Sequence, residues 1–131
     1  MRLPFLLLPV VLFGAAGVKA EESTAGPDVQ LSKAKLIGGR VEGLEEALEK
    51  TRDLVAMCVA THGGLVGDAG RLDVQLLVRD RGRAEGVEVG RAQHVSEDAV
   101  TCVRKLLKNR FIGTPTNDPV GVHYVYKLLK R

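Results

Sequence analysis

Residues 70–89 have the sequence GRLDVQLLVRDRGRAEGVEV, and this stretch decides the fold. In its first half, apolar residues from Leu72 to Val78 recur at every second position, which is typical of a strand with one buried face. Charged residues and a glycine at 80–83 form a turn, and Val87 and Val89 restore the alternation after it. The segment therefore predicts a β-hairpin, with strands over residues 71–80 and 84–89.

A helical pattern lies on each side of this hairpin. Before it, apolar residues spaced by three, four or seven positions predict a helix over residues 42–62, which ends at the glycine-rich loop 62–70. After it, Ser96 is a suitable N-cap, and Glu97 and Asp98 follow in the first turn, where the helix dipole favours acids. This second helix is predicted over residues 96–109.

A strongly alternating segment follows the second helix. Val120, Val122, Tyr124, Tyr126 and Leu128 occupy every second position of residues 120–128, which predicts a strand. A weaker alternation at residues 29–36 leaves room for one short strand near the start. The order of elements favours an α+β domain with a small antiparallel sheet of three to four strands and two helices packed on one face.

The first 20 residues resemble a cleavable secretory signal. Arg2 precedes an uncharged apolar run, and Val18-Lys19-Ala20 supplies the small-x-small ending, so we expect cleavage after Ala20. A retained membrane anchor is the alternative, but the apolar run is short and interrupted by prolines. The expected organisation is a signal peptide at 1–20, a flexible leader at 21–39 and one domain at 40–131, exported to the periplasm or secreted, with no stable membrane span after cleavage.

The charge balance argues against nucleic acid as a partner. The chain has 19 basic and 16 acidic residues, and removal of the signal takes away Arg2 and Lys19, so the mature net charge is 17 minus 16, or +1. Nucleic-acid binding draws most of its affinity from many phosphate contacts by basic residues. A nearly neutral domain with few aromatic residues does not offer such a surface.

Cys58 and Cys102 are the two cysteines of the chain. In an exported protein they favour a structural disulfide, which would close a loop of about 45 residues and contribute on the order of 4 kcal/mol. Two buried free thiols and a catalytic thiol are the alternatives. The spacing is unlike a C-x-x-C redox motif, and a metal site would require more ligands at close spacing than these cysteines and the three dispersed histidines provide.

No other residues form a recognisable catalytic or cofactor-binding pattern. The glycine run at 63–70 lacks the Lys-Ser/Thr pair of a phosphate-binding loop and precedes a strand instead of a helix. The three mature serines lie in the leader, in an early segment and at the predicted N-cap, so a Ser-His-Asp site has no good nucleophile. We therefore expect no catalytic residue, cofactor or metal, although acid pairs could form on folding. The histidines and acids that could still contribute to a site, depending on how the chain folds, are His62, His94, His123, Asp68, Asp73, Glu85 and Glu88.

Several segments together resemble a known domain family. They are LVAMCVATH at 54–62, GRLDVQLLVRDRGR at 70–83, SEDAVTCVRKLLKNRF at 96–111 and the final strand. They are similar to the C-terminal domain of the AgmX/PglI family of myxobacterial envelope proteins, which is in turn similar to the TonB C-terminal domain. The resemblance covers about residues 40–129 and implies a periplasmic α+β fold with Cys58 and Cys102 paired.

The sequence is compatible with two functions. The first is a non-enzymatic protein-interaction domain of the cell envelope that adds a partner strand at a free sheet edge, and pairing of two copies in this way would give a homodimer. The second is a small periplasmic ligand-binding protein or hydrolase that uses the open sheet face around His123 with two acids. A deep pocket would favour the second function.

Overall fold

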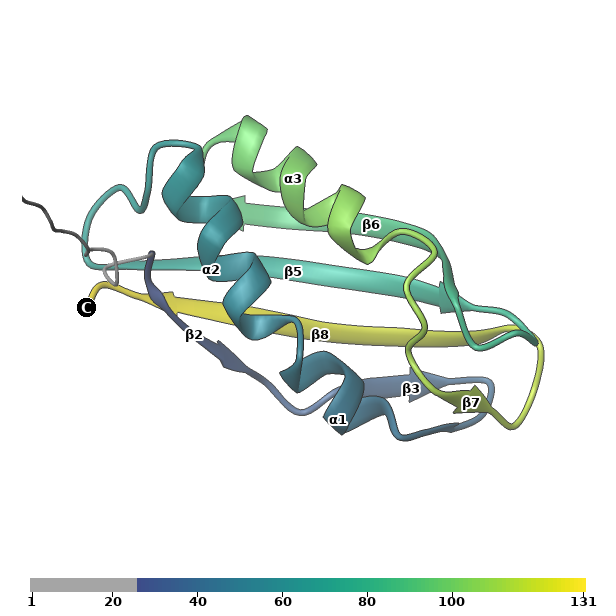
Figure 1. Ribbon diagram of the computed structural model, residues 1–131. Helices are drawn as coiled ribbons and strands as arrows, with labels where there is room; N and C mark the ends of the chain where they lie inside the picture. The colour runs from purple at the N-terminus through teal and green to yellow at the C-terminus, as the bar shows by residue number, and fades with distance from the viewer. Residues whose placement is uncertain (1–25) are drawn as a thin grey trace, which may run out of the picture.

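The computed structural model describes residues 26–131, and Figure 1 shows the arrangement of its elements. The predicted signal peptide and its cleavage site lie outside the described residues. The main sheet contains five antiparallel strands, in which β8 lies beside β5 and β5 beside β6, while the two short strands β2 and β3 both pair with the other side of β8. The bounds are Asp28–Leu31 for β2, Lys35–Ile37 for β3, Ala69–Val78 for β5, Ala84–Gln93 for β6 and Val120–Leu129 for β8.

The helices lie together on one face of this sheet, as Figure 1 shows. They are α1 at Leu44–Glu49, α2 at Arg52–Thr61 and α3 at Glu97–Leu107. Alternate residues of β5 and β8 are buried beneath them and form the core with the apolar sides of the helices. The predicted α+β architecture with helices on one face is therefore confirmed, and the opposite face of the sheet carries no helix among the described residues.

The sheet has five strands where three to four were predicted, because residues 28–37 belong to it. β2 pairs with the C-terminal half of β8 through Asp28↔Leu129 to Leu31↔Tyr126, and β3 pairs with its N-terminal half. Val29 is 2% exposed, so the start of the described chain contributes to the core. These residues were expected in a flexible leader with one short strand, and the structure places them in two strands.

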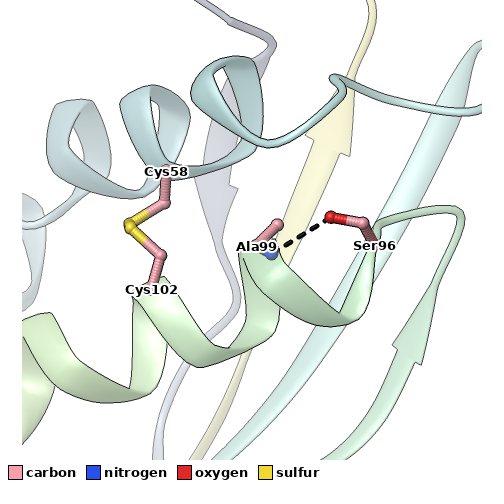
Figure 2. Close-up of a disulfide and its surroundings, with 4 residues drawn as sticks. All are labelled: Cys58, Ser96, Ala99 and Cys102. Atoms are coloured by element: carbon pink, nitrogen blue, oxygen red, sulfur yellow. Dashed lines mark hydrogen bonds between the residues drawn. A yellow bond between two sulfur atoms is a disulfide. The ribbon is translucent and has the colours of Figure 1, made fainter.

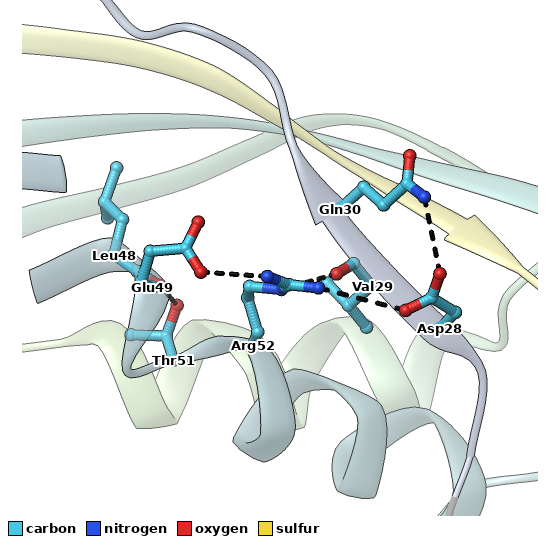
Figure 3. A network of polar contacts seen from close by, with 7 residues as sticks. All are labelled: Asp28, Val29, Gln30, Leu48, Glu49, Thr51 and Arg52. Carbon is cyan, nitrogen blue, oxygen red and sulfur yellow. Dashed lines mark hydrogen bonds and ion pairs between the residues drawn. The ribbon is translucent and has the colours of Figure 1, made fainter. Parts of the chain in front are cut away.

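A polar network holds β2 against the helices (Figure 3). Arg52 at the start of α2 donates from Nε to the carbonyl oxygen of Val29 at 2.6 Å and from Nη1 to Glu49 at 2.9 Å. Its Nη2 lies 3.8 Å from the Asp28 carboxylate, and these carboxylates raise the pKa of the Arg52 guanidinium, with the Glu49 hydrogen bond as the largest cause. One arginine thus connects the first strand to the helix layer.

The predicted helix over residues 42–62 is divided into α1 and α2 around Thr51. This residue is fully buried, and its hydroxyl donates to the Leu48 carbonyl at 2.6 Å. A buried hydroxyl that bonds to the backbone of the preceding turn is a common cause of a helix bend. The break therefore lies at the one polar side chain that the core contains in this region.

The second helix begins as predicted. Ser96 has extended backbone, and its Oγ accepts a hydrogen bond from the Ala99 backbone N–H at 3.1 Å, which is the geometry of an N-cap. Glu97 and Asp98 occupy the first turn and Arg104 and Lys105 the last turn, so the charges complement the helix dipole. Two short strands, β4 at Val41–Glu42 and β7 at Thr114–Pro115, pair in a separate small sheet.

Candidate functional site

The two cysteines form a disulfide that joins α2 to α3 (Figure 2). Their Cα atoms are 5.6 Å apart, within the usual range for a disulfide. The alternatives of two free thiols and of a catalytic thiol are therefore excluded by this pairing. A disulfide is also consistent with an oxidising extracellular compartment.

The three histidines are dispersed over the domain. His62 ends α2, where its backbone carbonyl accepts a hydrogen bond from Ser96 Oγ at 2.7 Å. The ring of His94 lies 2.7 Å from the Ala69 carbonyl oxygen, and His123 lies on the open sheet face. Within residues 26–131 no group of three or more metal-ligating side chains comes together.

A shallow hollow of about 500 Å³ surrounds His123 on the open face of the sheet. Its floor contains Gly86 and Gly121, which flank Leu77 in register across the sheet. Glu88 is the one acid in the lining, whereas the hydrolase hypothesis called for two acids and a deep pocket. Asp73, a predicted candidate, is instead engaged by Arg71 Nε at 2.7 Å.

A chain of buried hydroxyl groups crosses the core on the other side of the sheet. Tyr124 donates to Tyr126 at 2.9 Å, the hydroxyls of Tyr126 and Thr51 are 2.7 Å apart, and Thr51 donates to the Leu48 carbonyl. Because the Thr51 proton is used by Leu48, the Tyr126 hydroxyl must donate to Thr51. The two rings meet edge to face with centroids 5.0 Å apart.

The core raises the pKa of both phenols. Burial is the largest cause for each, and it is opposed at Tyr126 by the hydrogen bond that its oxygen accepts from Tyr124 and by the charge of Arg110. A raised folded-state pKa means that the phenols contribute stability below the unfolded pKa of about 10 and that this contribution is lost as the pH rises above it.

We therefore expect alkaline unfolding that is coupled to tyrosine ionisation. The chain has two tyrosines and no tryptophan, so near-ultraviolet phenolate absorbance reports these two residues alone. As the pH rises above about 10, this absorbance should increase together with the loss of far-ultraviolet circular dichroism. Phenolate formation near the ordinary pKa in a protein that stays folded would contradict the expectation.

The outer edge of β6 is the feature most suited to binding another chain. Ala84 is already paired on this side, since its N–H donates to the Arg110 carbonyl at 2.9 Å and its carbonyl accepts from the Asn109 N–H at 2.8 Å. The Lys108 ammonium donates to the Glu85 carbonyl. From residue 86 to 93, the described part of the chain supplies no backbone partner for β6 other than β5.

The opposite edge of the sheet is short and interrupted. It consists of β2 and β3, with four and three residues, separated by residues 32–34. Arg52 occupies the Val29 carbonyl on β2. An added strand would therefore find a longer continuous template on β6 than on this edge.

A β-bulge at Gly90 controls which side chains share a face of β6. Asp73 pairs with Arg91 and Val74 with Val89, so Gly90 is the extra residue. In a regular strand Glu88 and Arg91 would point to opposite faces, because they are three positions apart. The bulge places both on the open face, and neither has an ion-pair partner within 4.0 Å in the described residues.

On the helix side, the same edge of β6 continues into a groove beside α3. The groove is lined on α3 by residues one turn apart, with an acid near the N-terminus of the helix and a base near its C-terminus. An added strand would thus contact α3 with one set of alternate side chains and solvent with the other. The lining residues are Ala92, Val95, Glu97, Val100, Thr101 and Arg104.

No family model, curated protein or solved structure gives a significant match to the chain. Among residues 26–131, no helix has the length and apolar character needed to cross a membrane. Within residues 26–131 the protein is a disulfide-linked α+β domain whose sheet has one long open edge, at β6. A free edge could be predicted from the sequence, but its residues could not, because strand order across the sheet depends on contacts between residues distant in sequence.

Proposed function

We propose that this protein is a non-enzymatic interaction domain of the cell envelope, exported to the periplasm or secreted, that binds an extended segment of a partner protein along β6. The single observation that carries the proposal is the outer edge of β6 over residues 86–93, which has no backbone partner among residues 26–131. Strand addition at such an edge gives affinity through backbone hydrogen bonds.

The surroundings of the edge can supply specificity. Side chains of an added strand that point to the helix side would enter the groove lined by Val100 and Arg104, and those on the open side would meet Glu88 and Arg91. In peptide recognition by strand addition, pockets for alternate side chains of the added strand supply the specificity. The groove and the edge are continuous, since Ala92 belongs to both.

The cellular setting is supported by two features of the chain. The first 20 residues have the pattern of a secretory signal, and the disulfide is consistent with an oxidising compartment. The resemblance to the AgmX/PglI C-terminal domain, itself similar to that of TonB, adds an envelope role to the same proposal. In this fold the C-terminal strand β8 is paired on both sides, by β5 and by the short strands β2 and β3, so it has no free edge. The edge that we propose for binding is therefore that of β6.

Photo-crosslinking in producing cells tests the proposal. Gln93 on β6 and Gln30 on β2 lie in one cross-strand row, through Lys127 and Arg71, at opposite edges of the sheet, and both are exposed. A benzophenone amino acid at position 93 should yield an adduct heavier than the monomer, and the same group at position 30 should not. Adducts from both positions, or from neither, would contradict strand addition at β6.

A further inference from the structure

We propose that the strand added at β6 is β6 of a second copy of this chain, antiparallel and related by a two-fold axis between Val89 and Gly90. This inference rests on the proposed function, because it names the partner for the same edge. A two-fold interface uses the same surface on both copies, so every contact in it occurs twice. The edge must therefore be complementary to itself.

The charges on the open face meet this requirement. About an axis between residues 89 and 90, Glu88 of one copy lies opposite Arg91 of the other, and the same pair forms again across the axis. Both side chains are exposed and lack ion pairs within the described part of one copy. An axis at Glu88 or at Arg91 would instead place like charges opposite each other, which is destabilising.

The bulge makes this register compatible with both faces of the sheet. Directly opposite residues of paired strands must point to the same face. Glu88 and Arg91 both face the open side, whereas Val87 and Ala92 both face the helices, as their partners Leu76 and Leu72 show. In a strand without Gly90 as an extra residue, each of these pairs would point to opposite faces.

The helix beside the edge has the same self-complementarity. A two-fold axis perpendicular to the sheet places the α3 helices of both copies on one face, side by side and antiparallel. On the side of α3 that lines the groove, Glu97 lies near the start of the helix, Val100 in the middle and Arg104 near the end. Two antiparallel α3 helices would therefore bring Glu97 of each copy toward Arg104 of the other.

A charge-swap series tested by sedimentation velocity distinguishes this partner from others. The full chain, purified after export with its disulfide formed, should show a reversible monomer–dimer equilibrium. Glu88→Arg and Arg91→Glu should each weaken dimerisation at least about tenfold, because each turns two attractive cross-strand pairs into repulsive ones. The double variant Glu88→Arg/Arg91→Glu should recover dimerisation, and so should an equal mixture of the two single variants.

Matched controls keep the outcome interpretable. Glu46→Arg makes the same charge change at an exposed position on α1 and should dimerise like the unchanged protein. Thermal melts at a protein concentration low enough for every variant to be monomeric should be similar, since all three positions are exposed. A protein that is monomeric at every concentration, or single variants that dimerise like the unchanged protein, would overturn the inference.

The two proposals fail in different ways. If the protein is monomeric but position 93 crosslinks to another polypeptide in cells, strand addition at β6 stands and the second copy is the wrong partner. If the Glu88 and Arg91 variants dimerise as strongly as the unchanged protein, and position 93 gives no adduct, the interface lies elsewhere and both proposals are wrong.

Discussion

Replacing Cys58 and Cys102 together by alanine is expected to lower the free energy of unfolding by about 4 kcal/mol. The bond joins residues 44 positions apart, and its loss releases the unfolded chain from that constraint. For a domain of this size, such a loss corresponds to a fall of about 20 °C in the midpoint of thermal unfolding. Urea unfolding followed by circular dichroism measures the difference directly.

Alanine is the appropriate replacement because Cys58 is 5% exposed, so serine would place a hydroxyl in the core. Reduction of the unchanged protein provides the control, since it should produce most of the same loss without changing a side chain. Reductant should have no effect on the double variant. A loss below about 1 kcal/mol would show that the disulfide does little to restrict the unfolded chain.

The elements that could be predicted from the sequence are those with an uninterrupted local pattern. Residues 120–128 alternate without a break, and β8 covers them almost unchanged at Val120–Leu129. The N-terminus of α3 could be placed because Ser96 and the acids after it act within one helical turn. In both cases the information lies in neighbouring residues.

The elements that were missed depend on partners distant in sequence. The break between α1 and α2 coincides with the Thr51 contact to Tyr126, which is 75 residues away. β6 was predicted to end at Val89 but continues to Gln93, because the bulge at Gly90 shifts the alternation while pairing with β5 continues. The candidate site lies at this misjudged end of β6, where an irregular strand resembles a loop in sequence.

Changing Tyr126 to phenylalanine is the second large effect that we expect, a loss of about 2 kcal/mol. The Tyr126 hydroxyl is the middle of the chain that runs from Tyr124 through Thr51 to the Leu48 carbonyl. Its removal leaves the Tyr124 hydroxyl buried without its acceptor and deprives Thr51 of its donor. An unsatisfied buried polar group costs more than the net worth of a hydrogen bond.

The order of the hydroxyls predicts that Tyr124→Phe has opposite effects on stability in the unchanged protein and in the Tyr126→Phe variant. A loss of packing alone would have the same sign in both. Tyr124→Phe alone removes only the first donor, so it should cost about 1 kcal/mol. In the Tyr126→Phe background the same change removes an unsatisfied hydroxyl, so it should stabilise the protein. Adding Thr51→Val replaces the last of the three hydroxyl side chains by an apolar one of similar shape. The Leu48 carbonyl then still accepts a hydrogen bond from the backbone N–H of residue 51, at 3.0 Å.

Urea unfolding of the variants, arranged as a double-mutant cycle, measures these differences. The triple variant Thr51→Val/Tyr124→Phe/Tyr126→Phe should be more stable than Tyr126→Phe, because it buries no unpaired hydroxyl. Additive losses at Tyr124 and Tyr126 would show that the two hydroxyls act independently. A coupled result would show that three side chains act as one unit, which fixes the α1–α2 bend to the central strand β8 and so positions the helix layer over the sheet.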